Sequence, residues 1–327
     1  MHSRSALLKT LPLLFATLIL SGAVRAQIYP AKAVRIVVPF PPGAGVDIVT
    51  RLFTPRLTEM LGQQFIVDNR GGAAGNIGAE AVARAAPDGY ALLTAPSSAA
   101  ISRSLYKNLS FDLARDFEPI ALLASTPYVL VVHPSLPVRS VKELIALAKA
   151  RPGQLIFGSS GNGSGAHLAA ELFKMQAHVD LLHVPYKGTP PAVTDLIAGQ
   201  VSLVFGNTLS VLPQVKAGRL RGLAVTSAKR SLAAPELPTV AEAGLPGFES
   251  GTWFALLAPA GTPREIVTRL NATITKIGQT PDIRDRLAAQ GAEPLGGAPE
   301  EVGAFVRSEI TKWGKVVAAS GMRMAAC

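Results

Sequence analysis

The sequence is poor in several residue types, and each shortage excludes a class of protein. Its one cysteine, Cys327, ends a chain of 327 residues, so a disulfide scaffold, an internal zinc ribbon and a CxxC redox centre are excluded. Charged residues make up only 17% of the chain and apolar residues 48%, which excludes a disordered protein. The 30 glycines and 25 prolines follow no fixed period, so the chain is not collagen-like. What remains is a globular protein with enough apolar material for about two domains.

The N-terminus has the pattern of an export signal. Arg4 and Lys9 form a positively charged region, residues 11–20 are almost entirely apolar, and a small-residue cleavage site ends at Ala26. The uncharged stretch is shorter than the ~20 residues that an α-helix needs to span a bilayer, so an uncleaved membrane anchor is the weaker alternative. We expect a signal peptide over residues 1–26, cleavage after its last residue and a mature chain in the periplasm.

The excess of basic residues does not indicate a nucleic-acid-binding protein. Removal of the signal peptide takes away three of the 32 basic residues, which leaves 29 against 22 acidic ones and a net charge of +7. The remaining lysines and arginines are scattered, and the longest basic run is the pair Lys229-Arg230. Nucleic-acid-binding proteins concentrate charge on one face and interleave aromatic residues. We expect no nucleic-acid partner, and a surface charge that mildly favours anionic ligands.

Short β-branched runs alternate with amphipathic stretches, which is typical of an α/β fold. The expected strands form two sets, residues 34–38, 65–67 and 90–94 in the first and residues 155–157, 179–184, 201–205 and 220–225 in the second. No low-complexity linker separates the sets, so we expect two lobes joined by crossover strands, with residues 128–132 and 220–225 as candidates. Pro55 lies inside the first expected helix, residues 47–61, and should kink it or end it early.

Two glycine-rich loops, each between an expected strand and an expected helix, are the candidate ligand-binding elements. The first covers residues 40–47 and the second residues 158–167. In an open α/β sheet such loops lie at the carboxyl ends of the strands, where ligands bind. Glycines let the backbone approach a ligand, and the following helix offers unpaired N–H donors and the positive end of its dipole. The alternative is that both loops are simple tight turns.

Two side chains in these loops have an expected local role. Asp47 is expected to cap the helix after the first loop, and Ser164 to cap the second helix or to offer its hydroxyl to a ligand. Neither loop contains lysine or arginine, so an anion would be held mainly by neutral donors and water. Two such loops, one in each lobe, predict a cleft that holds its ligand from both sides.

No constellation for catalysis or metal binding is visible. His178 and His183 share an expected strand, where they face opposite sides and form a poor metal pair. His167 lies in the first turn of the helix after the second loop, where the dipole favours a neutral ring that could donate to a ligand; a partly buried packing role is the alternative. The second loop lacks the order of a nucleophile elbow and only loosely imitates a dinucleotide fingerprint. We therefore expect no enzymatic activity, no cofactor and no metal.

A series of short motifs spread over the mature chain matches one family. The motifs are FPPG at 40–43 with Asp47, GGAAGNIG at 71–78, APDGY at 86–90, DFEPI at 116–120, GSSGNGS at 158–164 with HLA at 167–169, VPYKG at 184–188, DLIAGQV at 195–201, LPTV at 237–240 with EAG at 242–244, and APAGTP at 258–263. In these motifs the chain resembles the substrate-binding proteins of tripartite tricarboxylate transporters, also called the Bordetella uptake gene family. One departure is Ala44, where the family often has a second glycine.

The resemblance implies a fold and a function. The fold is a two-lobed periplasmic binding protein of type 2, which closes on its ligand like a flytrap about two crossover strands. Lobe one would combine residues 27–125 with 227–327, and lobe two would cover residues 126–226. A monomeric protein would capture a small organic acid and deliver it to the membrane permease subunits of a tripartite tricarboxylate transporter. The alternative function is a periplasmic sensing partner that binds the same ligand and acts on a membrane signalling protein.

The resemblance also implies which residues contact the ligand. The expected contacts come from the two loops and from neighbouring strand ends: Phe40, Gly43, Ala44, Gly45, Asp47, Ala95, Ser97, Ser159, Ser160, Gly163, Ser164, His167, Tyr186, Gly188 and Asn207. Most of them would act through backbone N–H groups, hydroxyls and bridging waters. No catalytic residue and no metal ligand is expected among them.

Overall fold

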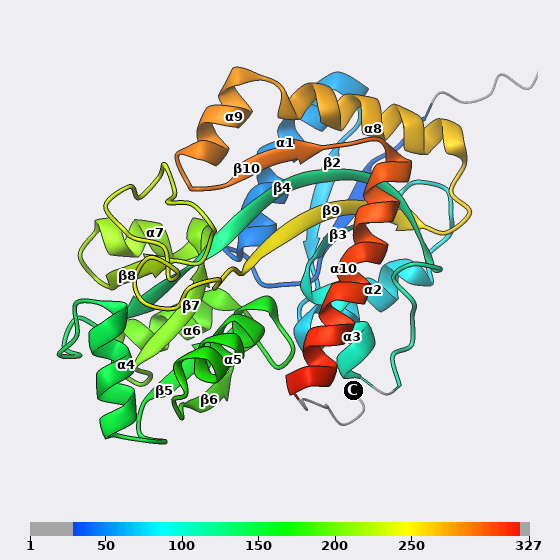
Figure 1. Ribbon diagram of the computed structural model, residues 1–327. Coiled ribbons are helices and arrows are strands. Elements are labelled where there is room, and N and C mark those ends of the chain that lie inside the picture. The colour runs from blue at the N-terminus through cyan, green and yellow to red at the C-terminus, as the bar shows by residue number, and fades with distance from the viewer. Residues whose placement is uncertain (1–28, 107, 321–327) are drawn as a thin grey trace, which may run out of the picture.

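The computed structural model describes residues 29–106 and 108–320. The predicted signal peptide, its cleavage point and Cys327 lie outside these residues. The described chain forms an α/β structure of two lobes that share one strand, β4 (Phe117–Val132), which runs from one lobe into the other (Figure 1). The predicted fold class is confirmed.

The first lobe has a mixed sheet with helices on both faces. Its strands, in spatial order, are β2 (Phe65–Asn69), β1 (Val34–Val38), β3 (Ala91–Pro96), β9 (Gly251–Pro259) and the first part of β4, to which β10 (Glu293–Gly296) also pairs. β1 is parallel to β2 and β3, whereas β9 is antiparallel to β3 and β4. One face packs against α1 (Gly45–Leu61), α8 (Arg264–Gly278) and α9 (Pro281–Ala288), and the other against α2 (Asn76–Ala83), α3 (Ser98–Leu105) and α10 (Pro299–Ser320).

The second lobe repeats this layering on a smaller sheet. Its strands are the second part of β4, β7 (Leu203–Asn207), β5 (Ile156–Ser159) and β6 (Leu182–Pro185), with β8 (Arg221–Val225) also paired to β4. One face packs against α4 (Val141–Ala150) and α5 (Gly165–Ala177), and the other against α6 (Thr189–Ile197) and α7 (Thr208–Lys216). Each lobe therefore has a hydrophobic core on both faces of its sheet.

The proline in the first helix does not break it. α1 continues through Pro55 to Leu61, and Gly62, in the left-handed conformation, ends it. A proline inside a helix costs about 3 kcal/mol because it removes a backbone hydrogen bond and crowds the preceding turn. Here Phe53 and Leu57, on either side of the proline, are buried in the first core. Burial of such side chains contributes about 1.5–3 kcal/mol each, enough to outweigh the proline, so the expected early end is wrong.

The hinge consists of two adjacent strands. The first crossing lies in the predicted strand but just before the predicted residues 128–132, because β4 pairs with β9 up to Pro127 and with β7 from Tyr128 onward. The second crossing differs, because β8 stays inside lobe two and the chain returns to lobe one at Gly251, where β9 begins opposite Pro127. The candidate crossing at residues 220–225 is therefore corrected to the start of β9.

The segment between β8 and β9 packs on lobe two. Val240, Leu245 and Phe248 are buried in the core that also contains α4 and α5. The predicted limits of lobe two, residues 126–226, stay a prediction, and these contacts lead us to propose that the lobe extends to about residue 250.

The two lobes are closed on each other. Ser210 in α7 donates a hydrogen bond to the carbonyl of Gly43 in the first glycine loop, at 2.9 Å. Tyr106, which ends α3, donates to the carbonyl of Asn162 in the second glycine loop, at 3.3 Å. The second loop also packs on lobe one, because a Cβ at Gly163 would overlap Leu105. Both glycine loops therefore take part in the contact between the lobes.

Candidate ligand-binding site

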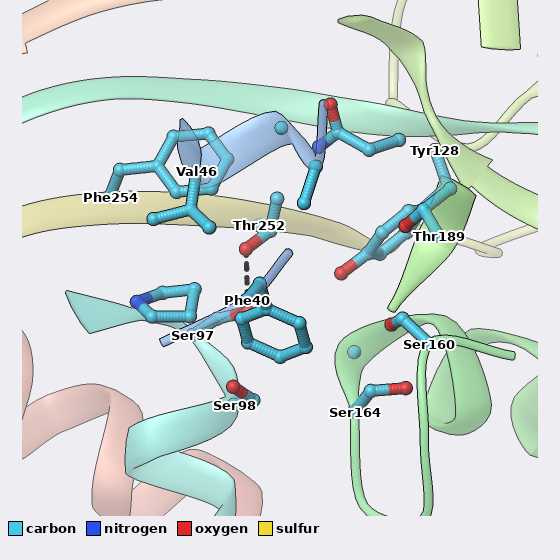
Figure 2. A pocket seen from close by; sticks show the side chains of 15 residues that line it. Phe40, Val46, Ser97, Ser98, Tyr128, Ser160, Ser164, Thr189, Thr252 and Phe254 are labelled. Atoms are coloured by element: carbon cyan, nitrogen blue, oxygen red, sulfur yellow. Dashed lines mark hydrogen bonds between the residues drawn. The ribbon is translucent and has the colours of Figure 1, made fainter. Parts of the chain in front are cut away.

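A cavity of about 40 Å³, here called the cleft cavity, lies between the lobes (Figure 2). It is lined by residues of both lobes: Phe40, Ala44, Gly45, Val46, Pro96, Ser97, Ser98, Tyr128, Ser160, Ser164, Gly165, Thr189, Asn207, Thr252 and Phe254. In Figure 2, Ser97 and Ser98 of lobe one lie across the cavity from Ser160 and Ser164 of lobe two. In this closed arrangement the volume has room for roughly three water molecules. A larger ligand would therefore require the lobes to separate slightly.

Five of the helices in the described chain begin at this cavity, and their first residues form much of its wall. The N-cap or first residues concerned are Ala44 and Gly45 of α1, Ser97 and Ser98 of α3, Ser164 and Gly165 of α5, Thr189 of α6 and Asn207 of α7. The N-terminus of a helix carries about half a positive elementary charge and N–H groups without a helical partner. The convergence of these termini gives the cavity the chemistry to accept an anion.

The polar side chains around the cavity are neutral. None of the described residues that line it is Asp, Glu, Lys, Arg or His. Ser97 and Thr252 share a hydrogen bond of 2.8 Å between their hydroxyls, which joins α3 to the hinge strand β9. Burial raises the pKa of Tyr128 to about 12, so this hydroxyl keeps its proton and can donate. The cavity therefore offers hydroxyl and backbone donors without a fixed charge.

The first glycine loop is held in shape by Asp47. Ala44 is the N-cap of α1, so Asp47 lies in the first turn and is not the cap that the sequence led us to expect. Its buried carboxylate accepts hydrogen bonds from the backbone N–H of Gly43 at 2.9 Å and from Arg51 and Asn69, both at 2.9 Å. Asp47 thus positions the loop from behind and does not line the cavity.

The second glycine loop is held by a serine and a histidine. Ser164 is the N-cap of α5, and its hydroxyl accepts from the backbone N–H of His167 at 3.2 Å. The Nδ1 atom of His167 accepts in turn from the backbone N–H of Gly163 at 3.1 Å. Ser159 lies beneath the loop, where its hydroxyl is 2.7 Å from Nε2 of His183. Of these supporting side chains, Ser164 also lines the cleft cavity, whereas Ser159 and His167 do not.

His167 belongs to a buried aromatic stack. Its ring lies 4.1 Å from that of His183, which lies 4.6 Å from that of Phe157, all nearly parallel. Strand register explains the contact, because Phe157 in β5 is paired with His183 in β6. Burial, the largest cause, and nearby positive charge lower the pKa of both histidines to about 4. The position of His167 fits the packing alternative, since it does not line the cavity.

Because of the pair His167 and His183, we predict that the protein loses stability in mild acid. The folded pKa of His167, about 4, lies below its ordinary value of 6.5, so the unfolded chain takes up a proton first as pH falls. The contribution of the neutral His167 ring to the free energy of unfolding is complete above about pH 6.5 and is lost between pH 6.5 and pH 4. For His167 alone this contribution amounts to about 3 kcal/mol. Urea unfolding at pH 7.5 and pH 4.5 measures it.

Two histidine variants separate this effect from general acid sensitivity. His167→Gln should flatten the fall between the two pH values, because the variant has one buried titrating ring fewer. His178→Asn, at an exposed position with a positive φ that asparagine tolerates, should keep the full fall. Equal pH dependence in the two variants would contradict the assignment.

A second, outer cavity of about 210 Å³ adjoins the cleft cavity and shares Phe40 and Ser160 with it. It is lined further by residues of both lobes: Gly72, Ala73, Ala74, Tyr106, Gly161, Asn162, Pro185, Tyr186 and Lys187. Lys187 is the one cation among these described residues. A ligand longer than the cleft cavity could therefore extend past Phe40 toward the surface.

The structure brings about half of the expected contact residues to the cleft cavity. Those that line it are Phe40, Ala44, Gly45, Ser97, Ser160, Ser164 and Asn207. The others lie behind the wall or beside it: Gly43, Asp47, Ala95, Ser159, Gly163, His167, Tyr186 and Gly188. Gly188 is the N-cap of α6, and Tyr186 lines the outer cavity while its hydroxyl donates to Asp195.

Several lining residues were not expected from the sequence: Val46, Pro96, Ser98, Tyr128, Gly165, Thr189, Thr252 and Phe254. Ser98, Gly165 and Thr189 are the first residues of their helices, and a search for helix starts after strands would have found them. Tyr128, Thr252 and Phe254 come from the two hinge strands, whose pairing no local pattern indicates.

Two hinged α/β lobes that close over a cavity of helix N-termini define a solute-binding protein of the periplasmic type. The chain belongs to the tripartite tricarboxylate transporter family receptors, whose family model matches residues 49–322. It is 39% identical to protein BugT of Bordetella pertussis, over 97% of this chain and 98% of that protein. The predicted family is confirmed.

Solved structures agree with this assignment. Rpa4515 of R. palustris with adipate is 42% identical and has a TM-score of 0.88, over 90% of this chain and 99% of that one. MatC of Rhodopseudomonas palustris with bound malate is 33% identical and has a TM-score of 0.84, over 88% of this chain and 100% of that one. The family is one of solute-binding receptors and not of enzymes.

Proposed function

We propose that this protein captures a small organic acid in the cleft cavity and delivers it to the permease of a tripartite tricarboxylate transporter. The observation that carries the proposal is the convergence of helix N-termini on a cavity whose described lining has no ionised side chain. An acid anion would supply the missing negative charge and accept hydrogen bonds from the unpaired N–H groups. The acids bound by the two relatives, adipate and malate, support this class of ligand.

The proposed contacts are those that line the cavity. The carboxylate would accept from the backbone N–H groups of Gly45 and Gly165 and from the hydroxyls of Ser97, Ser160 and Ser164, all of which belong to residues that line the cavity. The remainder of the ligand would extend toward the outer cavity, where Lys187 offers a positive charge. Ligand binding would favour the closed arrangement, because only that arrangement brings both sets of donors together.

We further propose that the protein acts as a monomer in the periplasm after cleavage behind Ala26. Receptors of this family are periplasmic. In the described residues, no helix combines the length and apolar character needed to cross a bilayer. The family of receptors to which the chain belongs supports delivery to a permease.

Thermal unfolding of residues 27–327 against a panel of acids tests the proposal. The protein is first unfolded and refolded, which removes any acid retained during purification. Adipate, malate and tricarboxylates are compared with their uncharged amides, which have similar shape. An acid at 100 times its Kd should stabilise the protein by about 2.7 kcal/mol, and its amide should have no effect. No stabilisation by any acid, or equal stabilisation by the amides, would refute an anion site.

A further inference from the structure

A larger cavity lies at the hinge, beside the cleft cavity. This hinge cavity has a volume of about 400 Å³ and is lined by β4 at the hinge, by the segment that leads into β9, by the start of β9, and by β10 and α10. Its volume is in the range of small-molecule sites. Thr252 lines both cavities, so they are neighbours across β9.

Neighbouring residues of β9 line different cavities, because successive side chains of a strand point to opposite faces. Along β9, Phe254 faces the cleft cavity, whereas Trp253 points to the other face, toward α10. There the indole of Trp253 donates a hydrogen bond of 2.9 Å to Oε2 of Glu309. The indole of Trp313 donates to the same oxygen at 3.0 Å. One buried carboxylate therefore fixes the orientation of two aromatic rings.

The charges around the hinge cavity are mainly negative. Three glutamates line it against one lysine, in a mature chain whose predicted net charge is positive. Lys312 places its Nζ 3.4 Å from Oε1 of Glu309 and 5.2 Å from the ring centroid of Trp313. Neither Glu249 nor Glu293 forms an ion pair with a described residue. Two exposed carboxylates thus remain at the cavity after the lysine is paired.

A buried hydroxyl in the same wall lacks a partner. Ser250 is only 7% exposed and lines the cavity. Its Oγ has no hydrogen-bond partner among the described residues. A buried polar group without a partner is costly, and a ligand that donates to or accepts from this hydroxyl would remove that cost once the side chain turns toward the cavity. It is an observation independent of the glutamates.

We propose that the hinge cavity binds a small organic ammonium ion. Carboxylates and the faces of tryptophan rings are the groups that attract such cations. Such a contact already exists within the chain, because the ammonium group of Lys312 lies beside the carboxylate of Glu309 and over the ring of Trp313. The ligand's ammonium would lie near Glu249 and Glu293, and its alkyl part would lie on the aromatic wall.

The chain's two tryptophans make the test specific. Both Trp253 and Trp313 line the hinge cavity, and the sequence has no other tryptophan. Choline chloride and butylammonium chloride, titrated at constant ionic strength, should change the tryptophan fluorescence saturably with a Kd below about 10 mM. The neutral isostere of choline, 3,3-dimethylbutan-1-ol, should bind at least tenfold more weakly. A linear response to choline, or equal binding of the neutral alcohol, would overturn the proposal.

Two double variants, each of which removes two carboxylates, complete the experiment. The double variant Glu249→Gln/Glu293→Gln should weaken choline binding at least tenfold, and both positions are exposed, so the fold should be kept. The double variant Glu59→Gln/Glu265→Gln removes the same charge at exposed positions of α1 and α8 and should leave choline binding unchanged. Equal affinities in the two double variants would overturn the assignment of the site.

Discussion

Replacing Gly45 by alanine is expected to weaken acid binding by roughly 10- to 100-fold and to leave the ligand-free protein as stable as the wild type. Gly45 is the first residue of α1, and a Cβ there would collide with the side-chain amide of Asn207 in the other lobe. Because the collision occurs only when the lobes are closed, it penalises the closed form alone, by the ~1–3 kcal/mol typical of overpacking. Calorimetric titration with the tightest-binding acid of the panel, beside thermal unfolding without it, measures both quantities.

A second glycine-to-alanine substitution is the control for Gly45→Ala. Gly278 ends α8, and a Cβ there would make only ordinary contacts with Phe53, at 3.9 Å or more. Gly278→Ala should therefore leave affinity unchanged and should not lower stability. Wild-type affinity in Gly45→Ala would show that the lobes do not close on the acid in the arrangement described here.

Placing a carboxylate in the cleft cavity should abolish acid binding and stabilise the protein without its ligand. In Ser160→Asp the new side chain lies where the helix N-termini converge, at a position that also borders the outer cavity. Its charge would occupy the place of the ligand's carboxylate, so we expect affinity to fall by at least about 100-fold. The interaction of a carboxylate with helix N-termini contributes about 0.3–2 kcal/mol. Calorimetry and thermal unfolding at low ionic strength are the measurements.

The uncharged isostere separates charge from shape in this experiment. Ser160→Asn fills the same space and should also lose acid binding, but it should not gain the stability of Ser160→Asp. If the asparagine and aspartate variants unfold at the same temperature, the cavity does not favour a negative charge, and the proposed ligand class is refuted independently of the acid panel.

The sequence predicts the loops and helices that form the site better than it predicts the individual residues that line the cavity. Both glycine loops could be found because a strand, a run of glycines and a helix start follow one another along the chain. Their position at the carboxyl ends of the strands follows from the topology of α/β sheets. Seven of the cavity residues lie in these loops: Phe40, Ala44, Gly45, Val46, Ser160, Ser164 and Gly165.

The remaining part of the site depends on long-range pairing. Thr252 reaches the cavity because β9 pairs with β4 in a register that sets Thr126 opposite Thr252. His183 supports the second loop because β6 pairs with β5 and α5 packs above them. Asp47 was misplaced for a local reason: Ala44 takes the cap position without a side-chain bond, and the carboxylate bonds the loop instead. The neighbours of these residues in the fold could not be derived from their spacing along the chain.

The absence of ionised groups from the described wall of the cleft cavity has a consequence for release. An acid bound by an arginine or lysine must break an ion pair when it leaves, and such pairs near a surface weaken as salt increases. Here the carboxylate in the cleft cavity would be held by peptide dipoles that are fixed in the backbone. Opening of the hinge would move the helix N-termini of one lobe away from those of the other in a single step. Whether the acid stays bound would then depend on whether the lobes are open or closed more than on the salt concentration of the solution.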